Sequence, residues 1–308
     1  MPRISIVTPC YNGEQFLAET LDSVVAQDMT DWELVVVDDG SKDRSAAIAQ
    51  EYAVRDPRIR LLAQENQGAS KARNNGAAAT DPAAPYLWFL DADDRLKPGA
   101  LTTLADYLDH HPEAVCAACE YDFIDERGAP VTPSHHEYSR VWRYVPHGGG
   151  VHALRDDEPN TPFLSIFSWC RIIPSAWIIR RTVFEKAGGY TSALQIGHDI
   201  DLALKCSLQG QVHFIPAEVR MEYRRHSGQK TAHLDRIRDE EQKLWNIWRS
   251  GEGLTDAQRA VVTDAWRFKE RRFAPHLMRI WAGDAFRKGD WRNGALLTLR
   301  AAKKRLFG

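Results

Sequence analysis

The sequence predicts an α/β fold, with a mostly parallel sheet flanked by helices and a helical extension at the C-terminal end. Short apolar runs rich in β-branched residues alternate four times with helical patterns in the first 110 residues. This alternation is typical of parallel strands joined by right-handed helical crossovers. Beyond Thr231 the pattern is helical and basic, and the formal charge is about +10 from Val219 onward, against about −12 before it.

The elements of the first half are expected to alternate between strand and helix. Their expected positions are 4–8, 14–27, 34–37, 44–54, 59–62, 71–79 and 86–90, followed by a helix that opens at Pro98. The strands are short apolar runs bounded by turn residues, and the helix at 14–27 places its apolar side chains on one face. Ser41 or Asp43 can cap the second helix, and Pro98 is tolerated in the first turn of the fourth.

The second half is less regular. Residues 125–162 are rich in Pro, His, Gly and charge, which predicts a mobile functional loop or an insertion. Regular patterns then resume. Strands are expected at 175–179, 212–215 and 219–223, and helices at 182–187, 198–208 and about 291–306.

Composition excludes several classes of protein. Of the 308 residues, 44% are hydrophobic and 27% are charged, as in ordinary soluble proteins, and a net charge of −2 argues against nucleic-acid binding. No apolar run reaches the roughly 20 residues that span a bilayer. The first residues lead directly into a strand, so we expect no signal peptide and a cytoplasmic protein. No Gly-x-Gly-x-x-Gly opens a helix, which argues against a dinucleotide-binding fold.

The run Trp88-Phe89-Leu90-Asp91-Ala92-Asp93-Asp94 is the strongest candidate for a site. Ligands of open α/β sheets bind beyond the carboxyl ends of the strands, where Asp91 and Asp93 would lie. Two adjacent carboxylates repel each other unless a cation lies between them, and Mg²⁺ prefers carboxylates together with phosphate oxygens. The alternative is a simple turn in which an Asp caps the next helix.

Five stretches, in order, resemble the family 2 glycosyltransferases, an inverting group with the GT-A fold. They are Val7 to Asn12, Val36 to Asp43, Asn66 to Gly76, Leu90 to Asp94, and Gly188-Gly189-Tyr190 with His198 to Leu202. The resemblance covers about residues 3–228. It implies a GT-A-type, Rossmann-like catalytic domain over 1–228, with a nucleotide-binding half at about 1–97 and an acceptor half at about 98–228. Residues 229–308 would then form the helical extension.

The resemblance also implies a site for the donor nucleotide. Asp39 would accept hydrogen bonds from the base, which in this family is most often uracil. Thr8, Pro9 and Tyr11 would line the base, with the ring of Tyr11 stacked on it. Arg73 would lie near the base or the phosphates. The alternative for Arg73 and its neighbour Asn74 is to brace a helix against a loop.

The resemblance further implies that Asp91 and Asp93 hold the sugar diphosphate through Mg²⁺ or Mn²⁺. A cation there would stabilise the negative charge that grows on the leaving diphosphate. His226 matches a position that reaches back to the metal or the diphosphate in many relatives, and its alternative is a surface residue after a strand. Arg224 and Arg225 could neutralise phosphate in addition.

Asp199 is the expected general base. Inversion by a single displacement needs one carboxylate beside the acceptor hydroxyl, and the start of a helix favours its ionised form. The alternative is a simple helix cap, and Asp201 is expected to pack or cap within the same helix. The family usually has an acidic residue just before this Asp, whereas this sequence has His198.

The resulting hypothesis is a metal-dependent inverting glycosyltransferase of bacterial surface polysaccharide synthesis. It would move sugar from a nucleotide-diphosphate sugar, expected to be UDP-linked, to a hydroxyl of a glycan or glycolipid. The basic C-terminal helices could contact the inner face of the membrane, or pack on the core. One alternative is a sugar nucleotidyltransferase, but Pro9 to Gly13 is not its Gly-rich phosphate loop. The other is a non-catalytic protein that binds nucleotide sugars.

Overall fold

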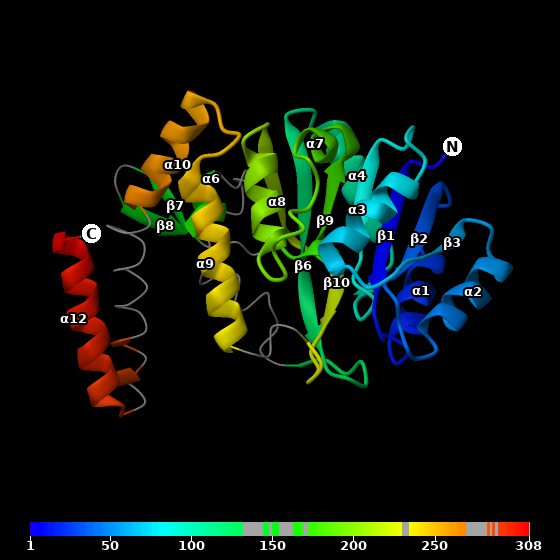
Figure 1. Cartoon of the computed structure of the whole chain (residues 1–308), viewed down its shortest axis with the longest axis horizontal. Coiled ribbons are helices and arrows are strands. Elements are labelled where there is room, and N and C mark those ends of the chain that lie inside the picture. The colour runs from blue at the N-terminus through cyan, green and yellow to red at the C-terminus, as the bar shows by residue number, and fades with distance from the viewer. Residues whose placement is uncertain are drawn as a thin grey trace.

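The protein folds around one eight-stranded sheet with helices on both of its faces (Figure 1). The computed structural model describes residues 1–131, 144–147, 150–153, 163–168, 172–229, 234–268, 282–283, 285–286 and 289–307. The strand order is β3-β2-β1-β4-β9-β6-β10-β5. A mixed α/β fold with a mostly parallel sheet is therefore confirmed.

The N-terminal half contains the four predicted strand–helix pairs. Its strands β1, β2, β3 and β4 are all parallel. The elements are β1 (Ile4–Cys10), α1 (Leu17–Val25), β2 (Trp32–Asp38), α2 (Ser45–Arg55), β3 (Ile59–Ala63), α3 (Ala69–Ala79), β4 (Tyr86–Phe89) and, after β5 (Arg95–Leu96), α4 (Ala100–His110). The carboxyl ends of β1, β2 and β4 consequently meet at one edge of the sheet.

The second half continues the same sheet in mixed directions. Strand β9 is antiparallel to both of its neighbours, and β6 and β10 are parallel to each other. The elements are β6 (Ala114–Ile124), η1 (Pro174–Ala176), β9 (Trp177–Arg180), α7 (Arg181–Lys186), α8 (His198–Ser207) and β10 (Gln211–Arg224). The two strands predicted at 212–215 and 219–223 form one strand, β10, with register shifts between Ile215 and Met221.

Part of the irregular region also has regular structure. Strands β7 (Tyr144–His147) and β8 (Gly150–Ala153) form an antiparallel pair, and α6 (Phe163–Ser168) follows them. The rest of the predicted loop, at 132–143, 148–149 and 154–162, lies outside the described residues.

Alternate side chains of the strands enter two cores, one on each face of the sheet. Leu34 and Val36 of β2 pack with α1, α2 and α4, whereas Val35 and Val37 pack with α3, α7 and α8. Burial on both faces explains why β2 has a continuous apolar run, as is usual for parallel strands. This packing fixes the sheet edge at which the polar strand ends lie.

Helix α9 (Leu234–Ser250) packs against the α/β core, and α10 (Asp256–Phe268) and α12 (Trp291–Phe307) follow it. Leu244 and Trp248 of α9 are buried in the second core. The Glu240 carboxylate accepts a hydrogen bond from the backbone N–H of Gln195, at 2.7 Å. Among the residues that the structure describes, no helix combines the length and apolarity needed to cross a membrane.

Candidate active site

A cleft of about 1420 Å³ opens at the carboxyl ends of β1, β2 and β4. This is the edge at which open α/β sheets bind their ligands. Seven of the predicted site residues line it: Pro9, Tyr11, Asp39, Arg73, Asp91, Asp93 and His226. Asp199, the predicted base, lines it as well. The cleft therefore contains most of the residues predicted to bind the donor, together with the predicted base.

The loop after β1 is held by the loop after β2. The Asn12 side chain accepts a hydrogen bond from the backbone N–H of Lys42 at 2.8 Å, and the backbone N–H of Asn12 donates to Ser41 Oγ at 3.0 Å. Asn12 has a positive φ of 53°, which short polar residues tolerate. The neighbouring Tyr11 lies at the cleft with 53% of its surface exposed, so its ring is available for a ligand.

Asp39, which also lines the cleft, holds the loop before α3 by hydrogen bonds. Its Oδ1 accepts hydrogen bonds from Gln64 Nε2 (2.7 Å) and the backbone N–H of Gln67 (2.8 Å), and its Oδ2 accepts one from the N–H of Gly68 (2.8 Å). A carboxylate has about four acceptor positions. Asp39 thus retains acceptor capacity while it fixes the loop before α3.

Thr8 does not line the cleft. Its side chain is fully buried in β1, whereas the next residue, Pro9, reaches the cleft. Successive side chains of a strand point to opposite faces, so a strand end exposes only part of its sequence motif. The expected contact between the Thr8 side chain and the base is therefore not supported.

Three carboxylates gather where β4 ends. One oxygen atom from each of Asp91, Asp93 and Asp94 lies within 4.8 Å of the others. Asp91 and Asp93 are 27% and 30% exposed, but Asp94 is fully buried. Carboxylate oxygens are the ligands that Mg²⁺ and Mn²⁺ prefer, so the donor set fits a hard divalent cation.

Asp94 supports the cluster from beneath. Burial, together with the neighbouring Asp93 and Asp91, raises the pKa of Asp94 well above the ordinary 3.8. Ser175 Oγ donates to Asp94 at 2.5 Å and accepts a hydrogen bond from the backbone N–H of Asp91 at 3.0 Å. Ser175, which the sequence patterns did not single out, therefore ties η1 to the end of β4.

His226 lies directly beside the cluster. Its Nε2 is 2.9 Å from Asp93 Oδ2, and its ring contacts Phe16 at a centroid distance of 4.9 Å. The fold thus brings His226 into direct contact with Asp93, which lies 133 positions away in sequence. This location is the one that the predicted metal role of His226 requires.

Arg224 occupies a different position from the one we expected. It is fully buried, and its guanidinium donates to the Glu19 carboxylate at 2.6 Å and to the backbone carbonyls of Asp93, Asp125 and Glu126. It does not line the cleft. We therefore assign Arg224 a supporting role beneath Asp93 in place of the predicted contact with phosphate.

Arg73 links the two sides of the cleft. Its guanidinium forms an ion pair with Asp91, contacts His198 Nε2 at 2.8 Å, and lies 5.2 Å from the centroid of the Tyr190 ring. It is only 3% exposed. His198, which replaces the usual acidic residue, thereby connects the start of α8 to the carboxylate cluster.

Asp199 lies at the start of α8, facing the cleft. Burial raises the pKa of its carboxyl above the ordinary 3.8, although its hydrogen bond from Ile200 N–H and the charge of Arg73 act in the opposite direction. A raised pKa makes a carboxylate a stronger base. Asp201, by contrast, is fully buried and bonded to Thr191, Lys205 and Trp248, which confirms its expected packing role.

Asn74 braces α3 against the loop before α8, which was one of the two roles considered for it. Its side-chain amide donates to the carbonyl of Tyr190 at 2.8 Å and accepts from the N–H of Tyr190 at 2.9 Å. The loop that precedes Asp199 is thus fixed to the helix that carries Arg73.

Four apolar side chains form part of the cleft lining, which we call the apolar wall. It is formed by Ile166 and Phe167 of α6 and by Leu244 and Trp245 of α9. Trp177 of β9, by contrast, is fully buried and does not line the cleft. An indole ring and apolar side chains can pack against the face of a sugar ring or an apolar group of an acceptor.

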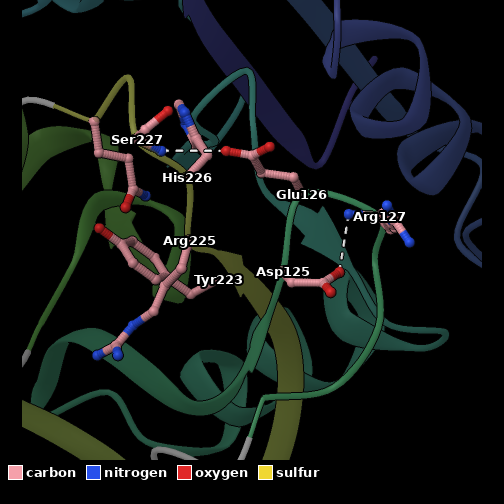
Figure 2. A pocket seen from close by; sticks show the side chains of 8 residues that line it. Asp125, Glu126, Arg127, Tyr223, Arg225, His226 and Ser227 are labelled. Atoms are coloured by element: carbon pink, nitrogen blue, oxygen red, sulfur yellow. Dashed lines mark hydrogen bonds between the residues drawn. The ribbon is translucent and has the colours of Figure 1, made fainter.

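A second hollow, of about 800 Å³, lies beside the cleft at the ends of β6 and β10 (Figure 2). Within it, the N–H of Ser227 donates to Glu126 at 3.3 Å, and the N–H of Arg127 donates to Asp125 at 2.9 Å. His226 and Glu126 line both hollows. The two hollows therefore share part of their lining.

The fold is that of the GT-A glycosyltransferases. S. aureus TarS in complex with UDP-GlcNAc superimposes with a TM-score of 0.59 and 16% sequence identity, covering 100% of this chain and 93% of that one. The mannosyltransferase PcManGT from Pyrobaculum calidifontis, in complex with GDP-Man and Mn²⁺, gives a TM-score of 0.64 and 17% identity, covering 99% and 87%. These likenesses define the class of fold.

The chain belongs to glycosyl transferase family 2, whose pattern matches residues 5–188. The uncharacterized glycosyltransferase RT0329 of Rickettsia typhi is 29% identical over 80% of this chain and 71% of its own length. The uncharacterized glycosyltransferase EpsJ of Bacillus subtilis is 36% identical over 43% of this chain, but that match spans only 38% of EpsJ. The B. subtilis protein TuaG, whose name assigns it to teichuronic acid biosynthesis, is 33% identical over 42% of this chain and 51% of its own.

Proposed function

We propose that the protein is a metal-dependent inverting glycosyltransferase that transfers sugar from a UDP-sugar to a hydroxyl of a glycan or glycolipid. The observation that carries the proposal is the meeting of Asp91, Asp93 and His226 with Asp199 in one cleft. The sequence separates these residues widely, and only the fold brings them together. The names of the relatives support a role in bacterial polysaccharide synthesis.

The nucleotide would occupy the part of the cleft between Tyr11 and Asp39. The exposed ring of Tyr11 offers a surface for stacking, and the Asp39 carboxylate offers an acceptor for an imide N–H of the base. Uracil has such an N–H beside its carbonyl groups. The two solved structures of this fold are complexes with different nucleotide sugars, UDP-GlcNAc and GDP-Man, so the uracil assignment rests on the chemistry of Asp39 and on the family resemblance.

Asp91, Asp93 and His226 would hold the divalent cation, Mg²⁺ or Mn²⁺. When bound, the cation would neutralise charge on the diphosphate that leaves with the nucleotide. The residues of the chain have their own tasks. Ser175 and Arg224 hold the backbone of the cluster in place, and Arg73 keeps Asp91 oriented.

Asp199 would take the proton from the acceptor hydroxyl as its oxygen attacks the anomeric carbon. One carboxylate suffices for this single displacement, and the configuration at carbon inverts. The acceptor would lie between Asp199 and the apolar wall of α6 and α9. That wall supports an acceptor that offers a sugar face or an apolar group to Trp245.

We also propose that residues 1–228 form the catalytic unit and that the helices after it complete the acceptor side.

Helix α12 exposes Trp291, Leu296 and Leu299, at 70%, 44% and 69%, and carries Arg292 and Arg300. Aromatic and basic side chains together favour contact with an anionic membrane. Sedimentation with vesicles that contain phosphatidylglycerol should capture the protein, and Trp291→Ala with Leu299→Ala should release it. If the wild type and the double variant sediment equally, α12 does not contact the membrane and is better described as a helix packed on the core.

Calorimetric titration with UDP, GDP and dTDP, each with and without Mn²⁺, tests the donor assignment. Tight, Mn²⁺-dependent binding of UDP alone is expected. Binding of GDP alone would retain the transferase and overturn the uracil assignment. If the folded protein binds none of the three nucleotides, the result would favour a protein that has lost its catalytic function. Binding of a nucleoside triphosphate together with a sugar phosphate would favour a nucleotidyltransferase.

A further inference from the structure

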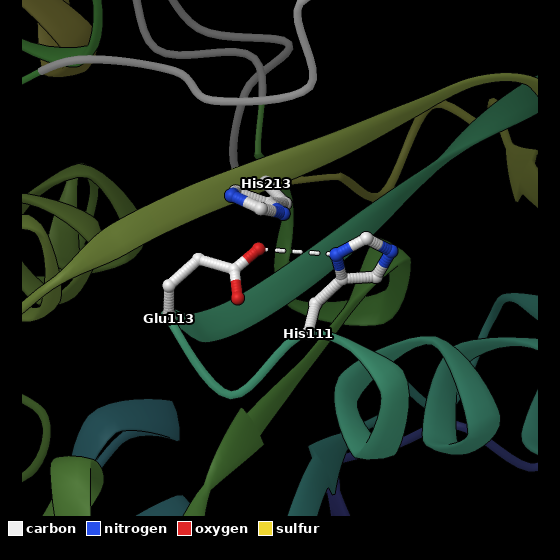
Figure 3. Close-up of side chains that lie close together, drawn as sticks. All are labelled: His111, Glu113 and His213. Carbon is white, nitrogen blue, oxygen red and sulfur yellow. Dashed lines mark hydrogen bonds and ion pairs between the residues drawn. The ribbon is translucent and has the colours of Figure 1, made fainter.

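A cluster of potential metal ligands lies at the end of the sheet opposite the active site. His111 follows α4, Glu113 precedes β6, and His213 lies near the start of β10 (Figure 3). One ligand atom from each of the three lies within 4.8 Å of the others. The 11 residues of β6, at about 3.3 Å each, separate this cluster from the active-site end by roughly 35 Å.

We propose that His111, Glu113 and His213 bind a zinc-like divalent transition-metal ion at a second site, separate from the active site. Two imidazoles and one carboxylate are a frequent ligand set for Zn²⁺, whereas Mg²⁺ prefers oxygen ligands alone. A tetrahedral zinc ion with bonds of about 2.0–2.2 Å keeps its ligand atoms roughly 3.3 Å apart. His111 Nδ1 and Glu113 Oε1 are already 3.0 Å apart.

His213 has the surroundings of a metal-binding imidazole. Only 2% of its surface is exposed, so it lies inside the fold and not on the surface. Its Nε2 lies 2.9 Å from Gln211 Oε1, which accepts a hydrogen bond from the ring in the tautomer that carries its proton on Nε2. Metal-binding histidines usually donate their other N–H to such an acceptor. In this tautomer the ligand atom is Nδ1, which has a free lone pair for a metal ion. In the structure, Nδ1 lies 2.9 Å from the Tyr107 hydroxyl.

The backbone that carries the three ligands is already fixed. Arg180 donates to the carbonyls of Leu108, His111 and Ala114, at 2.7, 3.2 and 2.8 Å. The N–H of Gln211 donates to the carbonyl of Glu113 at 3.2 Å and joins β10 to the loop. Tyr107 stacks on the His111 ring at a centroid distance of 4.2 Å. Only side-chain rotations are therefore needed to close the ligands on an ion.

An ion at this place would connect the end of α4 with the first residues of β6 and β10. A ligand that binds only the folded state stabilises it in proportion to its affinity and concentration. Zinc binding is therefore expected to increase the stability of the folded state, through the second half of the sheet. The donor chemistry at the other end of the strands is not expected to change.

The test is a zinc titration of the full chain, freed of metal beforehand, in competition with a chromophoric chelator. Asp93→Asn serves as the parent protein, because loss of this carboxylate weakens zinc binding at the active-site cluster. We expect one zinc equivalent on this parent, with an affinity at least about tenfold lower in His111→Ala and in Glu113→Gln. Both side chains are partly exposed, at 39% and 44%, so the folds of these variants should be preserved.

His110→Ala is the matched control, because His110 is the adjacent histidine but bonds the carbonyl of Asp106 outside the cluster. It should bind zinc as the parent does, and zinc should raise the unfolding temperatures of both. The proposal is overturned if the parent binds no zinc at micromolar concentration, or if His111→Ala and Glu113→Gln bind it as tightly as the control. Neither result would bear on nucleotide binding by the wild type, so the donor proposal would stand or fall separately.

Discussion

Asp199→Asn is expected to lower kcat by about 10²- to 10⁴-fold, the usual contribution of a general base. Asparagine keeps the size of the side chain and its place at the start of α8, but it cannot take a proton from the acceptor. The affinity for the donor nucleotide should change little, because Asp199 is not one of the residues proposed to contact the base or the metal. Initial rates of nucleotide release, together with calorimetric titration of UDP, separate the two effects. Wild-type turnover in this variant would overturn the assignment of the base.

The pH dependence of the rate provides a second readout. Because burial raises the pKa of Asp199 above 3.8, the base should become protonated, and kcat/KM should fall, at a pH above that value as the solution is acidified. The residual activity of Asp199→Asn should lack this acidic limb. A residue that only capped the helix would leave the limb in place.

Asp199→Asn should also be at least as stable as the wild type at neutral pH. A carboxyl whose pKa is raised in the folded state binds its proton more tightly there than in the unfolded chain. Its favourable contribution to stability is therefore present at low pH and is lost as the pH rises through the folded-state pKa. The amide carries no buried charge and escapes that loss, which thermal unfolding at pH 7 would detect.

Asp201→Asn is the matched contrast in the same helix. Asp201 forms an ion pair with Lys205 at 2.7 Å and accepts a hydrogen bond from Trp248 Nε1 at 3.1 Å. Loss of the ion pair should lower the unfolding temperature, while kcat of the folded protein stays within a few-fold of the wild type. Asp199→Asn should thus lower kcat without loss of stability, whereas Asp201→Asn should lower stability with little change in kcat.

Asp93→Asn is expected to remove most of the metal-dependent binding of the donor. Loss of one partner from a desolvated charge pair costs about 2–5 kcal/mol, which corresponds to roughly 30-fold or more in affinity. The substitution keeps the shape of the side chain and leaves the Arg73–Asp91 ion pair intact. The measurement is calorimetric titration of UDP in the presence of Mn²⁺. Chelation of the metal should reduce the wild type to the affinity of the variant.

Asp22→Asn is the control for the loss of one negative charge. Asp22 lies on α1, accepts a hydrogen bond from the Tyr52 hydroxyl at 2.6 Å, and does not line the cleft. It should bind UDP and Mn²⁺ as the wild type does. If Asp93→Asn matched this control, the carboxylate cluster would not be the metal site.

Local sequence patterns predicted the features that depend on neighbouring residues. Apolar runs that end in turn residues located β1 to β4 and, with them, the edge at which Asp39, Asp91 and Asp93 lie. These inferences succeeded because burial follows from local periodicity, and the parallel direction of the strands follows from their alternation with helices.

Features that depend on distant residues were not predictable in this way. The buried position of Arg224 results from Glu19, which lies 205 residues away in sequence, and from a carbonyl beside the carboxylate cluster. The link from Arg73 to His198 and the approach of Trp245 to the cleft likewise require the finished fold. The sequence motifs located the loops of the site, whereas the partners of each side chain were set by tertiary packing.

The position of α9 has a consequence for how such proteins diversify. The family pattern ends at residue 188, before the start of α8 and before all of α9. Leu244 and Trp245 nevertheless line the cleft, and Glu240 holds the backbone N–H of Gln195 just ahead of α8. Under the proposed function, substitutions in this late segment would change the apolar wall and leave Tyr11 and Asp39 in place. Exchange of the segment between homologous glycosyltransferases would then be expected to change the acceptor and to keep the donor.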